Sequence, residues 1–250
     1  MYNPYSLIDK KILVTGASSG IGRAIAIECS RMGATVIITG RDEERLHATL
    51  QKMENSENHI LVLADLSHMP DVENLVNVIP DKLDGVVQCA GFTIPKPFQF
   101  LTTENVRSVM GVNFEAPLYL TQYLLKKKKV SKGASVVFIS SISGVWVSAV
   151  AGSLYSASKG AINGLVKGLA IELASKEIRV NCVNPGMIMT DIFKDGEITT
   201  QQLQEDALKY PLKRYGKPEE VAFAVIYLLS DASRWVTGTN LLIDGGYTLL

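Results

Sequence analysis

Short apolar runs rich in Val and Ile alternate along the chain with longer segments of helical character. The short runs are almost continuously apolar, which is typical of strands covered on both faces of a sheet. Each pair of parallel strands requires a crossover of about a dozen residues, usually a helix. The alternation therefore predicts an α/β fold with a seven-stranded parallel sheet and helices on both faces. We expect strands at 11–15, 35–39, 60–64, 85–89, 135–140, 179–184 and 240–244, and helices at 22–32, 42–53, 71–79, 103–125, 155–175 and 218–229.

This architecture is the doubly wound Rossmann-type fold, in which ligands bind at the carboxyl ends of the strands where the strand order reverses. Residues 1–250 contain no repeat or linker that would divide them, so we expect a single domain. The one long irregular stretch is 187–217, after the sixth expected strand. Long loops in compact domains are often functional lids, so we expect this stretch to form a flap over a substrate.

The charge balance excludes several classes of partner. Twenty-five basic and twenty-five acidic residues cancel, so the surface as a whole is not drawn to nucleic acid or to an anionic membrane. The start of the chain lacks the apolar core of a secretory signal, and the longest apolar run, 221–229, is shorter than the roughly 20 residues of a bilayer span. These features predict a cytoplasmic protein that recognises its ligands locally.

Cysteine and histidine offer no evident chemistry. The three cysteines show neither CxxC nor metal-ligand spacing, so we expect buried free thiols and no metal site. The three histidines fall outside the ends of the expected strands, and we expect them at the surface. These residues are Cys29, Cys89 and Cys182, and His47, His59 and His68.

A glycine-rich turn follows the first expected strand. Residues 15–22 read TGASSGIG, which is TGxxxGxG rather than the general GxGxxG fingerprint, and they lead directly into a helix. Glycine permits the tight turn and the close approach of the backbone to a pyrophosphate, while amides at the helix start face the anion. We therefore expect a dinucleotide here. The expected contacts are Gly16, Ser18, Ser19, Gly20, Ile21 and Gly22.

The end of the second strand indicates which dinucleotide binds. The strand ends at Gly40 and Arg41 follows, whereas a protein selective for NAD is expected to place Asp or Glu there for the ribose hydroxyls. Arg attracts the additional phosphate of NADP, and Ser18 can add a hydroxyl to it. NADP(H) is therefore the expected cofactor, ahead of NAD(H). Asp42 is interpreted as a helix N-cap; if its carboxylate reached the ribose instead, the preference would weaken or reverse.

Asp65 and Leu66 follow the third expected strand. The carboxylate can hydrogen-bond the adenine edge while the leucine packs on the ring. On spacing alone, an Asp that caps a turn or a helix is an equally good interpretation. The dinucleotide signals on the other strands favour the adenine contact.

Tyr155 and Lys159 provide the chemistry of the expected reacting centre. Residues four apart lie on one face of a helix, one turn from each other. A phenol is a poor base at neutral pH, but a neighbouring ammonium favours its phenolate form. Tyr155 can then exchange a proton with a substrate oxygen. Ser141, at the end of the fifth strand, can hydrogen-bond the same oxygen and stabilise the charge that develops on it.

Together these motifs resemble the short-chain dehydrogenase/reductase family across nearly the whole chain. The sequence also carries Asn113 in GVNF, PG at 185–186 and DGG at 244–246. The resemblance implies an enzyme that transfers hydride between nicotinamide and a carbonyl or secondary alcohol. In it, Lys159 also binds the nicotinamide ribose, and Asn113 holds a water that passes protons onward. The implied catalytic set is Asn113, Ser141, Tyr155 and Lys159.

The resemblance implies further cofactor contacts after the fourth and sixth strands. Residues 90 and 91 are small enough for close approach of the cofactor. At the nicotinamide end, Thr190 and the backbone of Ile188 fix the carboxamide. The implied contacts are Ala90, Gly91, Pro185, Gly186, Ile188 and Thr190, in addition to Tyr155 and Lys159.

Two features depart from the family pattern. Gln88 and Cys89 stand where the family usually has two asparagines, so we expect the support of the central strand to differ in detail. Ser141 precedes Tyr155 by one residue more than is common in the family, and we assign the extra residue to the 145–154 loop. Ser143 is the alternative to Ser141.

The expected substrate site is surrounded by the apolar segments 92–100, 145–154 and 187–193, which indicates a hydrophobic carbonyl compound. The chain is most similar to bacterial 3-oxoacyl-acyl-carrier-protein reductases of fatty acid biosynthesis, which implies a thioester on an acidic carrier protein. Lys126–Lys129 is a candidate contact for that carrier. Lysines after a helix, however, more often form a solvated face.

The same sequence is also compatible with other functions. One is a general ketone, sugar or steroid alcohol dehydrogenase, and another is a dinucleotide-binding sensor without turnover. Sugar-nucleotide epimerases share the Tyr-xxx-Lys spacing, but they carry larger carboxyl-terminal domains than this chain provides.

The resemblance also implies a homotetramer, formed through the two long helices around the fifth strand and through the terminal strand, where apolar Leu249 and Leu250 are compatible with burial.

Overall fold

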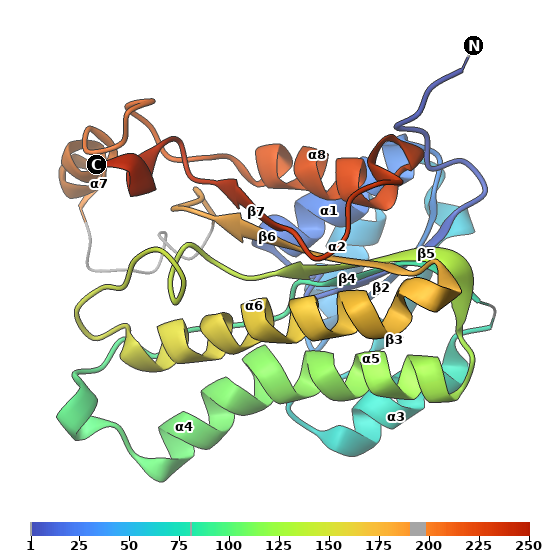
Figure 1. Cartoon of the computed structure of the whole chain (residues 1–250), viewed down its shortest axis with the longest axis horizontal. Coiled ribbons are helices and arrows are strands. Elements are labelled where there is room, and N and C mark those ends of the chain that lie inside the picture. Colours follow the sequence, from blue (N-terminus) through green and yellow to red (C-terminus); the bar gives the residue numbers. More distant parts are fainter. Residues whose placement is uncertain (1, 81, 191–198) are drawn as a thin grey trace.

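The computed structural model describes residues 2–80, 82–190 and 199–250 and confirms the single-domain α/β fold (Figure 1). All seven strands are parallel and follow the order β3-β2-β1-β4-β5-β6-β7. The strands are β1 (Lys11–Thr15), β2 (Thr35–Gly40), β3 (Ile60–Leu63), β4 (Leu83–Gln88), β5 (Val130–Ile139), β6 (Arg179–Pro185) and β7 (Asn240–Ile243). The α-helices of the described residues are α1 (Gly20–Arg31), α2 (Glu43–Leu50), α3 (Met69–Val78), α4 (Thr103–Met110), α5 (Ala116–Lys126), α6 (Ser153–Leu173), α7 (Thr200–Ala207) and α8 (Pro218–Leu229).

Helices cover both faces of the sheet. α1, α2 and α8 pack on one face, and α3, α5 and α6 pack on the other (Figure 1). Successive strand residues point to opposite faces, so Leu13 joins the core under α3, α5 and α6 while Val14 joins the core under α1 and α8. Both side chains are fully buried, which explains why the strands read as continuous apolar runs.

The strand order reverses between β1 and β4. The chain crosses from β1 to β2 on one side of the pair and from β4 to β5 on the other. At such a reversal, doubly wound sheets bind ligands beyond the carboxyl ends of the strands. The glycine-rich turn follows β1 and the residues after Gln88 follow β4, so the expected site residues lie at this edge.

The helix expected at 103–125 is two helices joined by a π-turn. Residues Gly111–Glu115 form the turn between α4 and α5, and the Ala116 N–H bonds to the Gly111 carbonyl five residues earlier. Pro117 has no backbone N–H, so it cannot make the α-helical hydrogen bond to the carbonyl of Asn113. Proline in the first turn of a helix is common, but here it interrupts a segment whose apolar pattern indicates one continuous helix.

Two of the three cysteines match the expectation. Cys29 and Cys182 are buried, and burial raises the pKa of each thiol to about 12. Cys89 is only partly buried, so the expectation is wrong there. The reason is its position one residue beyond the end of β4, at the open carboxyl edge of the sheet.

Two of the three histidines lie at the surface, as expected. His47 and His68 are exposed, whereas His59 is half-buried and its Nδ1 accepts a hydrogen bond from the Val36 N–H at 3.1 Å. Among the described residues, no three side chains of His, Cys, Asp or Glu converge as metal ligands. In the same part of the chain, no helix combines the length and the apolarity needed to cross a bilayer.

Candidate active site

The glycine-rich turn packs directly against the segment that follows β4. Gly16 has a φ of +67°, and a Cβ on it would lie 2.8 Å from the Cα of Ala90. Gly20 has a φ of +53°, and a Cβ there would lie 3.3 Å from Cγ2 of Thr190. A Cβ on Gly22 would collide with the carbonyl of Gly16. The turn thus requires glycine at three positions and presents bare backbone at the start of α1.

The amino-terminal end of α1 is suited to an anion. Ser19 is the N-cap residue, but its side chain makes no capping hydrogen bond, and no acidic residue lies in the first turn. The amides of this turn and the positive end of the helix dipole therefore point toward the edge of the sheet without a competing carboxylate. Arg23 braces the turn, because its guanidinium donates to the Ser18 carbonyl and to Oγ1 of Thr49.

Replacing Gly16 by Ala is expected to abolish dinucleotide binding and to destabilise the fold. The new methyl group must displace the Ala90 backbone at a positive φ, which together costs about 2 kcal/mol or more and lowers the melting temperature by roughly 5 °C. Thermal denaturation and NADPH titration measure the two effects. Gly168→Ala is the control, because that helical glycine has nothing within 4 Å of the added Cβ; equal effects of both substitutions would contradict the explanation.

Thr15 ties the ends of β1 and β4 together. Its Oγ1 accepts hydrogen bonds from the N–H groups of Cys89 (3.0 Å) and Ala90 (3.2 Å) and donates to the Val87 carbonyl (3.4 Å). This buried hydroxyl holds the segment after β4 against the glycine-rich turn. Sequence reasoning took Thr15 only as the end of a strand, and a buried hydroxyl at a strand end is the signal that could have identified it.

The end of β2 carries an exposed positive charge. Arg41 is exposed, and Oγ of Ser18 lies 3.6 Å from the position of a Cβ on Gly40. The carboxylate of Asp42 accepts the N–H of Arg45 at 2.9 Å and caps α2, which confirms the N-cap interpretation. The hydroxyl of Ser18 therefore lies near the start of α2. In the sequence, Arg41 stands between Gly40 and the N-cap residue Asp42.

Asp65 is engaged in a local turn. Its Oδ1 accepts the Ser67 N–H (2.9 Å) and the Ser67 Oγ–H (2.7 Å). These hydrogen bonds, with a smaller contribution from the charge of Arg41, hold the pKa of the Asp65 carboxyl below its usual range. Leu66 is buried under the sheet edge. Of the two interpretations from the sequence, the turn cap is the one whose hydrogen bonds the structure contains.

Tyr155, Lys159 and Ser141 meet at the carboxyl end of β5. The Lys159 side chain is 4 % exposed, and its Nζ donates to the Ile139 carbonyl at 2.8 Å. The same Nζ lies 5.8 Å from the centroid of the Tyr155 ring. Oγ of Ser141 is buried and accepts the N–H of Ser143 at 3.0 Å. Because Oγ already accepts this bond, its own O–H remains free to donate to a ligand.

Two further polar residues hold the lysine in place. Oγ of Ser140 donates to the Lys159 carbonyl at 2.9 Å, and Nδ2 of Asn163 donates to both Oγ of Ser140 (2.9 Å) and the Lys159 carbonyl (2.8 Å). All three residues are buried. This arrangement fixes α6 against the end of β5 at the turn that carries Lys159. The sequence analysis did not single out Ser140 or Asn163.

Asn113 connects three segments of the site. Its Oδ1 accepts the Phe92 N–H at 3.0 Å, and its Nδ2 donates to the Phe92 carbonyl at 2.9 Å and to Oγ of Ser158 at 3.0 Å. A Cβ on Gly91 would lie 3.1 Å from Oδ1 of Asn113 and 3.3 Å from Nζ of Lys159. Asn113 and Lys159 therefore approach the same small residue. The Asn113 amide is committed to protein partners, which leaves its backbone carbonyl as the better acceptor for a water.

The PG and DGG motifs meet beyond β6. The Gly186 N–H donates to the Ile243 carbonyl at 2.8 Å, and a Cβ on Gly186 would lie 3.0 Å from Cα of Asp244. The Pro185 carbonyl accepts the Ile142 N–H at 3.1 Å. These contacts join the segments after β5, β6 and β7 and lead the chain toward the glycine-rich turn.

The two ends of the 187–217 stretch are joined. Ile188 forms a β-bridge with Gly216, whose carbonyl accepts the Met189 N–H at 2.9 Å and whose N–H donates to the Met187 carbonyl at 3.0 Å. Within the stretch lies α7. Residues 191–198, which include Phe193 of the expected substrate wall, lie outside the described residues.

The other expected walls of the substrate site contact each other. The Lys96 N–H donates to the Ala151 carbonyl at 3.0 Å, which links the 92–100 and 145–154 segments. Both segments carry large apolar side chains that are exposed at this end of the molecule: Phe98, Phe100, Val145, Trp146 and Val150.

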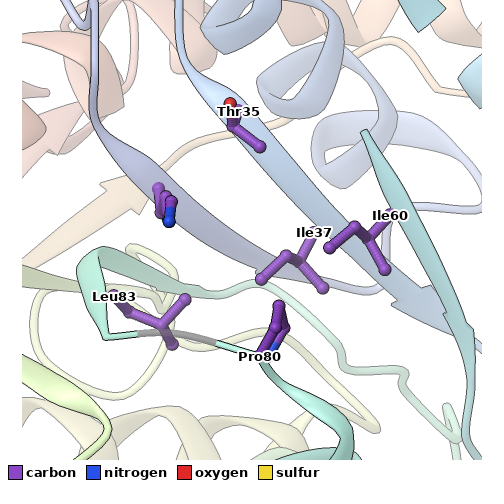
Figure 2. A pocket seen from close by; sticks show the side chains of 6 residues that line it. Thr35, Ile37, Ile60, Pro80 and Leu83 are labelled. Carbon is purple, nitrogen blue, oxygen red and sulfur yellow. The ribbon is translucent and has the colours of Figure 1, made fainter. Parts of the chain in front are cut away.

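A small apolar hollow lies at the opposite edge of the sheet (Figure 2). It is lined at the amino-terminal ends of the strands by Thr35, Ile37, Ile60, Pro80 and Leu83, together with Lys11. A second hollow borders the 187–217 stretch, between Ile188, Arg214, Glu220 and the DGG turn. Only the second hollow is near the residues that the sequence analysis assigned to the site.

Comparison with known proteins gives one consistent result. A protein-family model described as enoyl-(acyl carrier protein) reductase matches residues 16–248. The 3-oxoacyl-[acyl-carrier-protein] reductase FabG of Rickettsia felis is 34% identical over 244 residues, which cover 98% of this chain and 99% of that protein. The L-rhamnose 1-dehydrogenase (NAD(P)(+)) of Azotobacter vinelandii is 34% identical over 96% of this chain and 97% of its own length.

A solved structure supports the same conclusion. The RhlG/NADP active-site complex of Pseudomonas aeruginosa superposes with a TM-score of 0.91 at 30% sequence identity, over 99% of this chain and 100% of that one. These matches span the full sheet and the glycine-rich turn. Tyr155 and Lys159 lie at the carboxyl edge of that sheet. The relatives named here are oxidoreductases. The chain belongs to the short-chain dehydrogenase/reductase family, whose members are oxidoreductases that bind NAD(P).

Proposed function

We propose that this protein is an NADP(H)-dependent oxidoreductase that interconverts a carbonyl compound and a secondary alcohol. The observation that carries the proposal is the buried Lys159, whose Nζ lies 5.8 Å from the Tyr155 ring centroid and next to Gly91. A binding protein without turnover has no need for a phenol held next to an ammonium at the edge where the cofactor lies. The catalytic set we propose is Asn113, Ser141, Tyr155 and Lys159.

The residues present fit a dinucleotide. Glycine at position 16 lets the turn pack against the Ala90 backbone, where a Cβ would collide, and the start of α1 offers amides to phosphate. Beyond the phosphates, Ala90 and Gly91 leave room beside β4. When bound, the nicotinamide supplies or accepts the hydride. The proposed contacts are Gly16, Ser18, Ser19, Gly20, Ile21, Gly22, Arg41, Asp65, Leu66, Ala90, Gly91, Tyr155, Lys159, Pro185, Gly186, Ile188 and Thr190.

The side chains of the chain itself move the proton and hold the substrate oxygen. Tyr155 donates its phenolic proton to that oxygen in reduction and accepts it in oxidation. Ser141 donates a hydrogen bond to the same oxygen with the O–H that its Ser143 contact leaves free. Lys159 uses one of its three N–H donors on the Ile139 carbonyl, and the other two are available for a ribose hydroxyl and for a water at the Asn113 carbonyl.

Selectivity for NADP(H) is proposed to depend on Arg41. Arg41 is exposed and follows Gly40, which lies beside Oγ of Ser18. The adjacent Asp42 carboxylate caps α2, and the Asp65 carboxylate is hydrogen-bonded to Ser67, which together with the charge of Arg41 lowers the pKa of that carboxyl. Arg41→Ala is expected to lower kcat/KM for NADPH by about 10- to 100-fold, the effect of losing a charged hydrogen bond, while kcat/KM for NADH changes little. Steady-state kinetics with both cofactors measure this.

Arg45→Ala is the matched control for the selectivity experiment. Arg45 is equally exposed, lies in the first turn of α2 and pairs with Asp42 at 3.4 Å. Arg45→Ala should leave the ratio of kcat/KM for NADPH to kcat/KM for NADH unchanged. A wild-type preference for NADH, or an equal loss with both cofactors in Arg41→Ala, would overturn the assignment.

For the substrate we propose a hydrophobic carbonyl compound, with a 3-oxoacyl thioester as the first candidate. The exposed apolar side chains of the 92–100 and 145–154 segments favour an alkyl or acyl group over a sugar, and two similar proteins are a 3-oxoacyl-[acyl-carrier-protein] reductase and a sugar dehydrogenase. NADPH oxidation with acetoacetyl thioester, simple ketones and aldoses as substrates tests this. Faster turnover of the sugars would reject it.

We also propose an acyl-carrier protein as a partner and a homotetramer as the assembly. In the basic run, Lys129 Nζ donates to the Ile79 carbonyl and Lys126 Nζ to Oε1 of Gln122 at 3.1 Å, which favours a solvated face over a docking patch. Leu249 and Leu250 are exposed in the single chain and available for a subunit contact.

We also propose that the 187–217 stretch, joined at its two ends, forms the flap over the substrate.

A further inference from the structure

The polar contact that ends β4 leads to the π-turn. Gln88 is 4 % exposed, and its Nε2 donates to the Pro117 carbonyl at 3.4 Å and to Oγ1 of Thr121 at 3.3 Å. Oγ1 of Thr121 in turn donates to the same Pro117 carbonyl at 2.7 Å. Two buried donors thus converge on the carbonyl of one proline in the first turn of α5.

Pro117 also deprives the π-turn of one α-helical hydrogen bond. Because it lacks an N–H, the Asn113 carbonyl cannot receive its ordinary α-helical hydrogen bond, and the chain instead closes the wider Ala116-to-Gly111 ring. Such turns are rare and are found frequently at functional sites. The Gln88 and Thr121 contacts fix the position of this proline relative to β4.

The segment that follows β4 also contacts the π-turn, at Asn113. Four residues after Gln88, the backbone of Phe92 makes two hydrogen bonds to the Asn113 amide. The π-turn is therefore held at both ends by one segment, at Pro117 through a side chain and at Asn113 through the backbone. We expect a displacement of Pro117 to move Asn113, four residues earlier in the chain, relative to Lys159, which approaches the same Gly91.

We infer that Gln88 is a positioning residue for proton transfer: through Pro117 and Thr121 it sets the π-turn that presents Asn113 to Lys159. Asparagine, the residue usual in the family at this position, is one methylene shorter and would not span the same distance to Pro117. The inference rests on the proposed function in that Asn113 and Lys159 serve proton transfer. The part that concerns the π-turn is independent of activity.

Gln88→Leu tests the inference, because it keeps the volume of the side chain and removes its amide. We expect kcat to fall by about 10- to 100-fold, as a displacement of roughly 1 Å in a reacting group can cause, with the Kd for NADPH within about twofold of wild type. The solvent deuterium isotope effect on kcat should rise, because proton transfer becomes slower relative to the other steps. Amide hydrogen exchange at 111–117 should accelerate about tenfold, with α1 unchanged.

Two companion variants make the result specific. Gln122→Leu makes the same chemical change on the exposed side of α5 and should leave kcat and hydrogen exchange unchanged. Thr121→Val removes the second donor to Pro117 and serves if Gln88→Leu does not fold. In the double variant, kcat should fall by less than the product of the two single-variant effects, because Gln88 and Thr121 act through the same Pro117 carbonyl.

The outcomes separate this inference from the proposed function. Unchanged hydrogen exchange at 111–117 in both Gln88→Leu and Thr121→Val would overturn the inference, whatever the activity. Faster exchange with unaltered kcat and isotope effect would overturn the link to proton transfer. A wild-type protein with no NADPH-dependent turnover would instead reject the proposed function, while the exchange data would still decide whether Gln88 holds the π-turn.

Discussion

Tyr155→Phe is expected to lower kcat by about 10³-fold or more, with the Kd for NADPH within about twofold of wild type. The substitution removes only the phenolic O–H, so the ring still packs below the Lys159 ammonium. A positioned general acid or base contributes typically 10²- to 10⁴-fold to a rate, and Tyr155 is the one proton donor we assign to the substrate oxygen. Single-turnover oxidation of NADPH and fluorescence titration of the cofactor measure the two quantities.

Tyr119→Phe is the matched control for this experiment. Tyr119 is exposed on α5, where it stacks on Tyr123 with ring centroids 6.2 Å apart, and its hydroxyl should not influence turnover. Wild-type kcat in Tyr155→Phe would contradict the proposed mechanism and would favour the alternative of a dinucleotide sensor. Loss of NADPH binding in Tyr155→Phe would mean that the phenol acts on the cofactor rather than on the substrate.

Lys159→Met is expected to lower kcat by about 10³-fold or more and also to weaken NADPH binding. Unlike the tyrosine, the lysine has two proposed tasks: it places a positive charge beside the phenol that exchanges the proton, with its Nζ 5.8 Å from the ring centroid, and it binds the nicotinamide ribose. The substitution also leaves the Ile139 carbonyl without its donor, which costs about 1–3 kcal/mol of folding stability. Kinetics, cofactor titration and thermal denaturation measure these three effects.

Lys167→Met controls for the loss of a lysine from the same helix. Lys167 is exposed on α6, two turns beyond Lys159, and its replacement should leave activity and cofactor affinity unchanged. A Lys159→Met variant with unaltered NADPH affinity would contradict its proposed contact with the ribose. A variant with unaltered kcat would contradict the pairing with Tyr155.

The sheet and the motif residues were predictable because their signals are local. Continuous apolar runs indicate strands that are buried on both faces, as Leu13 and Val14 illustrate. The carboxyl ends of parallel strands lie at one edge of the sheet whatever the details of packing. The glycine positions follow from backbone geometry that no other residue tolerates. The four-residue spacing of Tyr155 and Lys159 places them together in any helix.

The supporting contacts were not predictable, because each one joins segments distant in the sequence. Thr15 reaches the segment after β4, Asn163 reaches Ser140, and Gln88 reaches Pro117. Nothing near these residues in the sequence indicates their partners, since the register between neighbouring elements decides which polar groups meet. The π-turn was missed for a related reason: a proline near a helix start is an ordinary start signal.

A crystal structure of the protein with NADP⁺ would place Lys159, Tyr155 and Ser141 relative to the bound cofactor. We expect a ribose hydroxyl on the nicotinamide side within about 3.2 Å of Lys159 Nζ, and Tyr155 Oη and Ser141 Oγ both within hydrogen-bond distance of one point beside the nicotinamide ring. A complex in which the phenol and the ammonium face apart, or in which the ring lies away from the carboxyl ends of β4 and β5, would contradict the proposed roles of Tyr155 and Lys159.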